Sequence, residues 1–183
     1  MNYKCNIFII SSLIFYTGCI SYTQKERKLL HTYQADEVLV FRSEKSGNIK
    51  RFKITRVSDE FAGFNEGHPG LKRWGEIDYI DLDNKRESPL LVIDKDYDTP
   101  SDTASIFLDF GDFGDHYFVD SGRTYEIDSM MINSKIYRDI TITHTSASFE
   151  NTPHQVIQIY WQENFGIVKY DLLDGDSYVR INL

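Results

Sequence analysis

The sequence predicts a mainly β protein: a single antiparallel sheet of roughly ten strands, curved or closed into a half-barrel or sandwich, with little helix. Two observations predict this class. Apolar and polar residues alternate with a period of two in many short segments, which is typical of half-buried strands. No stretch of twelve or more residues shows the 3.6-residue period of an amphipathic helix. The length of 183 residues fits one domain.

The strands are predicted from this alternation and from the turn residues between them. Gly47 lies in a polar loop between two alternating segments, and Asp174-Gly175 separates another such pair, which is a strong hairpin signal. The segment Ser129–Tyr137 is ambiguous, and one or two helical turns are expected around Glu26–Leu30. The predicted strands are Glu37–Phe41, Ile49–Val57, Ile77–Leu82, Leu90–Ile93, Ile106–Phe110, Tyr117–Val119, Thr124–Ile127, Ile140–Thr143, Gln155–Trp161, Gly166–Tyr170 and Tyr178–Leu183.

The N-terminal segment has the pattern of a targeting signal. Lys4 supplies a positive charge, and the residues from Cys5 to Tyr16 carry none. This apolar run is too short to span a hydrocarbon core, which needs about 20 residues, but it fits the apolar region of a signal peptide. The run ends in small residues before Cys19. Small residues at that place let a peptidase reach the backbone, and the thiol can carry a diacylglycerol as a thioether.

This ending resembles the lipobox of bacterial lipoproteins at Thr17, Gly18 and Cys19, and departs from it at Tyr16, where an aliphatic residue is usual. The resemblance implies a signal peptide over residues 1–18, a lipidated tether over 19–34 and one β domain over 35–183. It also implies a membrane partner through the lipid, at the outer membrane of a Gram-negative bacterium. An ordinary cleaved secretory signal with a chance cysteine is the alternative.

A second resemblance covers residues 122–183. Its motifs are Tyr137-Arg138-Asp139-Ile140, Ile159-Tyr160-Trp161 and the segment Phe165–Tyr170. Together they are similar to the C-terminal half of many uncharacterised envelope lipoproteins, some of which are related in shape to half-barrel carriers of acyl chains. The motifs are strands and turns, so the resemblance implies a fold and supplies no catalytic residue.

The net charge of −8 argues against a nucleic-acid partner, because such proteins neutralise phosphates with a basic surface. The basic residues are concentrated before residue 57. Three of them, Lys25, Arg27 and Lys28, are close enough to Cys19 to contact anionic headgroups, at about 1 kcal/mol per charge. Other basic residues of this region are expected on the solvated faces of two strands.

Asp94, Asp96 and Asp98 form the sharpest candidate metal site. Carboxylates at alternate positions of a loop can converge on calcium, which takes six to eight oxygen ligands. The EF-hand pattern fails here, because Thr99 stands where glycine is required and Ser105 where a bidentate glutamate belongs. The alternative is an acidic, solvated loop, and it is the favoured one. No cofactor other than calcium is indicated.

Tyr160 and Trp161 are the candidate contact residues for a ligand or partner. Adjacent residues of a strand face opposite sides, so one ring is expected in the core and the other on an open face, where it can stack on a sugar or a partner. Tyr170, Tyr178, Phe165 and Trp74 can extend such a surface. The alternative is cross-strand aromatic pairing that only stabilises the sheet.

Three functions follow from these features. The first is a non-enzymatic envelope lipoprotein that binds a protein or small-molecule partner through a sheet face, because the usual catalytic motifs are missing from the sequence. The second is a carrier of apolar ligands or acyl chains, with an unfilled concave sheet and with Met130 and Met131 as lining candidates. The third is a surface hydrolase of glycans or peptides, with His116 or His144 beside two carboxylates in a cleft.

Overall fold

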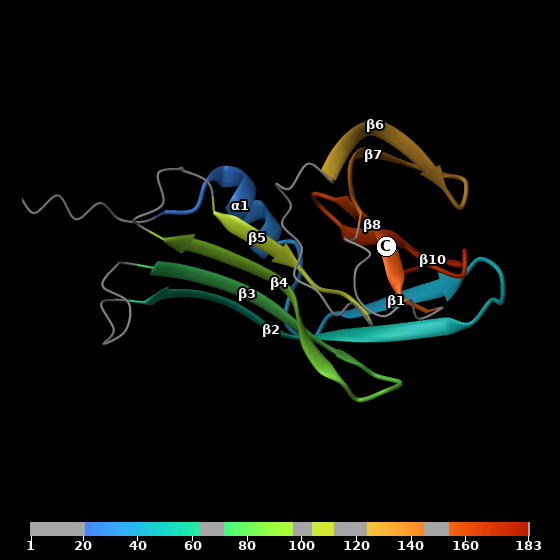
Figure 1. The fold of residues 1–183 in the computed structure, drawn as a ribbon, viewed down its shortest axis with the longest axis horizontal. Coiled ribbons are helices and arrows are strands. Elements are labelled where there is room, and N and C mark those ends of the chain that lie inside the picture. The colour runs from blue at the N-terminus through green and yellow to red at the C-terminus, as the bar shows by residue number, and fades with distance from the viewer. Residues whose placement is uncertain (1–20, 63–71, 97–103, 112–123, 145–153, 183) are drawn as a thin grey trace, which may run out of the picture.

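The computed structural model describes residues 21–62, 72–96, 104–111, 124–144 and 154–182. These residues form one helix and ten strands (Figure 1). The elements are α1 (Gln24–Leu30), β1 (Val38–Ser43), β2 (Ile49–Ala62), β3 (Lys72–Asp81), β4 (Glu87–Asp96), β5 (Ser105–Leu108), β6 (Thr124–Ile132), β7 (Lys135–His144), β8 (Val156–Gln162), β9 (Gly166–Leu172) and β10 (Ser177–Arg180).

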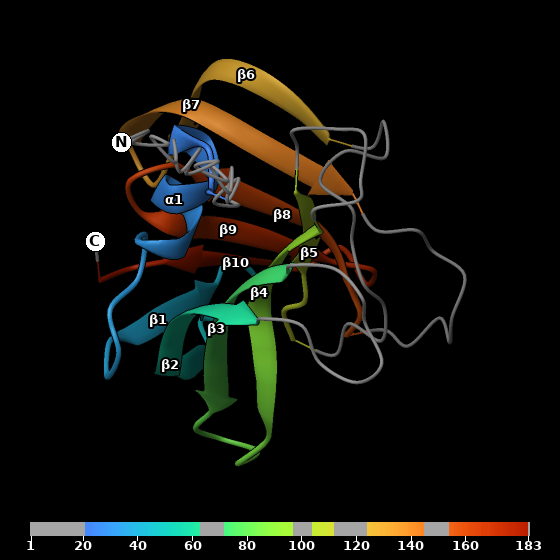
Figure 2. The same ribbon diagram turned by 90° about the vertical axis from the view of Figure 1, so that its left-hand side faces the viewer.

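All ten strands belong to one antiparallel sheet with the order β5-β4-β3-β2-β1-β10-β9-β8-β7-β6. The sheet curls into a half-barrel, which confirms the fold class predicted from the alternation (Figures 1 and 2). Strands that follow each other in the chain pair with each other, except β5 and β6, which form the two edges of the sheet. The last strand, β10, pairs with the first, β1, with Phe41 opposite Arg180. This pairing joins the two halves of the sheet. No helix among the described residues is long and apolar enough to cross a membrane.

The ambiguous segment Ser129–Tyr137 forms the tip of the β6–β7 hairpin. Asn133 and Ser134 make the two-residue turn, and both have positive φ, 49° and 64°. Such a turn matches the right-handed twist of the two strands, and asparagine accepts this backbone conformation more readily than most residues. The consecutive apolar residues before the turn interrupt the alternation, which explains why the sequence pattern is ambiguous there. The predicted strand Tyr117–Val119 lies outside the described residues.

Two apolar clusters cover the two faces of the curled sheet. The larger one fills the concave face and joins strands of both halves: Phe110 contacts Phe52 of β2 and Tyr170 of β9, with ring centroids 4.7 and 5.1 Å apart. The smaller cluster lies on the opposite face of β6–β10 and includes Ile140 and Val168. Strands β8, β9 and β10 contribute residues to both clusters and are therefore buried on two sides, whereas β6 is largely exposed.

The segment 21–34 is part of the concave core, which corrects the prediction that residues 19–34 are a tether. Tyr22, Leu30 and Tyr33 are each buried in the larger cluster. Two glycines make room for them: a Cβ on Gly75 would lie 2.5 Å from Leu30 Cδ1, and a Cβ on Gly166 would overlap the Tyr33 hydroxyl. These glycines come from β3 and β9, so the docking site is built by residues far away in the chain.

Helix α1 lies between the two edges of the half-barrel (Figure 2). Thr23 and Glu26 form a capping box at its N-terminus. The Glu26 carboxylate also accepts hydrogen bonds from the N–H of Ala104, just before the edge strand β5, at 2.9 Å, and from Lys95 Nζ at 3.3 Å. On the other side, Lys25 pairs with Glu126 of the edge strand β6 at 3.4 Å. The helix therefore connects the two sheet edges.

Candidate ligand pocket

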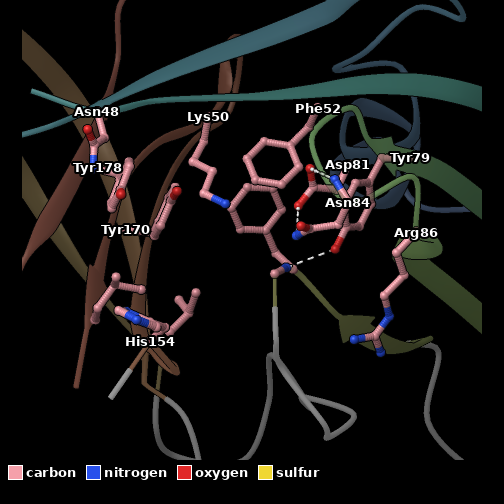
Figure 3. A pocket seen from close by; sticks show the side chains of 14 residues that line it. Asn48, Lys50, Phe52, Tyr79, Asp81, Asn84, Arg86, His154, Tyr170 and Tyr178 are labelled. Atoms are coloured by element: carbon pink, nitrogen blue, oxygen red, sulfur yellow. Dashed lines mark hydrogen bonds between the residues drawn. The ribbon is translucent and has the colours of Figure 1, made fainter. Parts of the chain in front are cut away.

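A pocket of about 290 Å³ opens on the concave face at the end away from α1 (Figure 3). Its walls come from the starts of β2, β8 and β10, the ends of β3 and β9, the β3–β4 turn and the residues after β5. It has an aromatic floor and a polar rim. The lining residues are Asn48, Lys50, Phe52, Tyr79, Asp81, Asn84, Arg86, Phe110, Gly111, His154, Val156, Tyr170, Leu172 and Tyr178.

Phe110 forms the centre of the floor. It follows β5 and is fully buried, and its ring contacts those of Phe52, Tyr170, Tyr79 and Phe41. Two backbone features direct it inward. The N–H of Asp109 donates to the carbonyl of Leu90 at 2.9 Å, and the N–H of Gly111, with φ +82°, donates to Tyr79 Oη at 2.8 Å. Phe110 therefore closes the middle of the half-barrel and limits the depth of the pocket.

Tyr170 and Tyr178 form one wall as a stacked pair, with centroids 5.1 Å apart and planes at 1°. They lie opposite each other in the β9–β10 register, which explains the stacking. Burial raises the pKa of both hydroxyls, and it also raises the pKa of Tyr79. All three tyrosines are therefore neutral at physiological pH. The wall offers flat apolar surface and uncharged hydroxyl groups.

The rim carries more positive than negative side chains. Lys50 and Arg86 line the pocket, and Figure 3 shows the Lys50 side chain pointing into the space that Tyr170 and Tyr178 border. Among the described residues no carboxylate pairs with the Lys50 amine. Asp81, the one lining carboxylate, accepts hydrogen bonds from the N–H groups of Asp83 at 2.8 Å and Asn84 at 3.2 Å, so it holds the β3–β4 turn.

This arrangement suits a small ligand with a flat apolar part and an anionic group. The volume is near the lower end of typical ligand pockets, and such sites combine apolar walls with a few polar groups that orient the ligand. His154 at the rim is exposed and pairs with Asp174, Nδ1 to Oδ2 at 3.4 Å. The rings can stack on the flat part, while Lys50 and Arg86 attract the anion.

The two aromatic residues proposed from the sequence lie elsewhere. Tyr160 and Trp161 face opposite sides of β8, as predicted, but both are buried. Trp161 packs edge-on against Tyr33 at 5.7 Å on the concave face. Tyr160 lies in the smaller cluster, where its hydroxyl donates to Asp171 at 2.7 Å. Neither ring therefore stands on an open face, because each face of this strand has its own apolar cluster.

The proposed calcium ligands are described only in part. Asp94 lies on β4, and its Oδ2 accepts a hydrogen bond from Lys72 Nζ at 2.6 Å. Asp96 ends the same strand, while its side chain and the whole of Asp98 lie outside the described residues. Over the part of the chain that the structure describes, no group of three or more His, Cys, Asp and Glu side chains is placed to hold a metal ion. Calcium binding stays a prediction.

The described residues among those named for the other two functions do not line the pocket. Met130 packs against the smaller cluster, and Met131 is exposed on β6. His144, at the end of β7, stacks on Tyr125 at 5.5 Å. His116 lies outside the described residues.

Of the aromatic residues named as an extension of the contact surface, only Tyr170 and Tyr178 reach the pocket. Their signal in the sequence is their place on either side of the Asp174-Gly175 turn, which puts them opposite each other in a hairpin. Sequence reasoning missed Phe110 and Lys50. Phe110 is the last residue of a predicted strand, and nothing local shows that the chain turns inward there. No family model, curated protein or solved structure matches the chain.

Proposed function

We propose that the protein is a lipid-anchored envelope protein that binds a small anionic ligand in the concave pocket without catalysing a reaction. The observation that carries the binding part is the pocket itself, where stacked tyrosines and a buried phenylalanine meet Lys50. A half-buried lysine without a carboxylate partner among the described residues supports an anionic group on the ligand, since desolvating such a charge is costly unless it is paired.

The anchor part of the proposal rests on the sequence before Ser21. The uncharged run from Cys5 to Tyr16, followed by Thr17-Gly18-Cys19, supports a signal peptide that is removed before an acylated cysteine. We place the protein on the periplasmic side of an outer membrane, because no acidic residue follows Cys19 up to Gln24. Labelling cells with radioactive palmitate tests this part. Wild type should incorporate label and Cys19→Ala should not; equal labelling would remove the anchor.

The binding part is tested with two matched probes, naphthalene-2-sulfonate and the uncharged 2-naphthol. The acylated protein is held in lipid nanodiscs and titrated by calorimetry, with empty nanodiscs as the blank. We expect the sulfonate to bind more tightly than the naphthol, and Lys50→Met to weaken the sulfonate about tenfold, because a charge-assisted contact is lost. The same variant should leave the affinity for 2-naphthol within about twofold.

Lys25→Met is the matched control, since Lys25 is 71% exposed and lies beside β6, away from the pocket. It should bind both probes as the wild type does. The proposal would be contradicted if the wild type bound neither probe, or if the two lysine substitutions affected sulfonate binding equally.

A further inference from the structure

We propose that the α1 end of the domain lies directly on the membrane surface, so that the pocket opens away from it. The inference rests on the proposed acylation of Cys19. It concerns a contact surface for lipid headgroups, formed at the end of β2 and the start of β3 beside Tyr22.

The connection between lipid and domain is too short to act as a tether. Tyr22 follows Cys19 by three residues and is already 1% exposed. Its hydroxyl donates to the carbonyl of Ile93 at 3.2 Å, and the guanidinium of Arg73 lies over its ring at 4.6 Å. Three extended residues span at most about 11 Å. The headgroup layer on one side of a bilayer takes roughly 5 to 8 Å of this distance. The surface around Tyr22 must therefore touch the headgroups.

The side chains near Tyr22 suit this position. Arg73 lies opposite Phe61 in the β2–β3 register, and Phe61 is 56% exposed although it is apolar. On the next residue of β3, the Trp74 ring has Lys72 Nζ 5.2 Å from its centroid. Arg73 and Lys72 are paired with Asp59 and Asp94, each at 2.6 Å, so it is the aromatic rings that suit a membrane interface, because such rings enter the headgroup layer.

The strands fix the orientation of the pocket. Strand β2 runs from Lys50 at the pocket to Phe61 beside Arg73, eleven residues further on. At about 3.3 Å per residue this is roughly 36 Å. Figure 1 shows β2 and β3 extending from the side of α1 toward the turns at the other end. With Phe61 at the headgroups, the pocket faces the aqueous phase, where it can receive a soluble ligand.

The test compares two labelled positions in the acylated protein on liposomes. Phe61→Cys and Leu173→Cys each place an exposed thiol, the second in the β9–β10 turn, where Leu173 is 42% exposed. After processing, Cys19 is blocked by lipid, so a fluorescent NBD group labels the new cysteine alone. Phospholipids with a spin label at the headgroup quench nearby NBD. We expect quenching at position 61 to exceed that at position 173 at least threefold.

A third variant tests the short connection itself. Twenty Gly/Ser residues inserted between Ile20 and Ser21 would add about 25 Å of flexible chain. Quenching at position 61 should then fall to the level at position 173; unchanged quenching would show that the connection does not set the distance.

Two failures remain distinguishable. Equal quenching at positions 61 and 173 in a palmitate-labelled protein overturns the orientation and leaves the anchor standing. Absence of palmitate label overturns both.

Discussion

The two ends of the concave face are filled to different extents. At one end, the segment 21–34 inserts Tyr22, Leu30 and Tyr33 against strand glycines, and the sheet is sealed. At the other end, Phe110 forms the floor of a pocket of about 290 Å³ that stays open. The pairing of charged side chains also differs between the two ends. Glu26 is clamped by Lys95 and Ala104, whereas no described carboxylate pairs with Lys50. One end is therefore built for stability and the other can accept a ligand.

A substitution that disturbs the packing of segment 21–34 should have the largest effect on stability. Gly166→Ala places a Cβ against the buried Tyr33 ring at a backbone φ of +72°. We expect a loss of about 4 kcal/mol in the free energy of unfolding, from overpacking together with backbone strain. Gly47→Ala is the control, because Gly47 has nearly the same φ, +74°, and open space around it. It should cost about 1 kcal/mol. Urea denaturation measures both, and equal losses would show that Tyr33 does not depend on this contact.

Removing the Glu26 carboxylate should lower the free energy of unfolding by somewhat less. Glu26 is 4% exposed, and Glu26→Ala takes away an ion-pair partner of Lys95 and the acceptor of two backbone N–H groups. We expect a loss of about 3 kcal/mol, since the charged groups of a buried pair are costly when separated. Glu26→Gln keeps an acceptor for the N–H groups and should lie between wild type and alanine. An alanine variant as stable as wild type would mean that α1 does not hold the sheet edges.

The same carboxyl gives stability a defined pH dependence. Burial opposes ionisation of Glu26, but the N–H groups of Ala104 and Thr23 and the charge of Lys95 outweigh it, so its pKa lies below the ordinary 4.5. A lowered pKa means that the unfolded chain takes up the proton first. The contribution is therefore complete above about pH 5 and is lost as the pH falls through the folded pKa. Denaturation midpoints between pH 3 and 7 should fall less steeply in Glu26→Gln than in wild type.

The pocket end should show the smallest effect on stability. Lys50→Met should change the free energy of unfolding by less than about 0.5 kcal/mol, because a half-buried lysine without an ion pair contributes little to the fold. Thermal unfolding measures this directly, with Gly166→Ala as the contrasting variant. A loss above 2 kcal/mol would mean that Lys50 is structural, and its effect on sulfonate binding could not then be assigned to contact with the ligand.

The fold could be predicted from local patterns in the sequence. The structure at the two ends of the concave face could not. Alternation in segments such as Gln155–Trp161 reports burial on one face of a strand, and that is a local property. Strand β2 runs on to Ala62 beyond the predicted end at Val57, because charged residues there stand on solvated positions and carry no apolar signal. The docking of Tyr33 depends on Gly166, more than a hundred residues away. The pocket likewise could not be predicted, because it depends on the contact of Phe110 with Tyr170 of β9, which is far away in the chain.

The pairing of β10 with β1 has a consequence for how the chain acquires its structure. Strand β10 lies near the centre of the sheet, and its ladder with β1 is the strand pairing that joins the hairpins of the first half to those of the second. The two halves of the sheet therefore cannot pair with each other until β10 is in place. Without β10, the two sheet edges that this strand covers, at β1 and at β9, would be open.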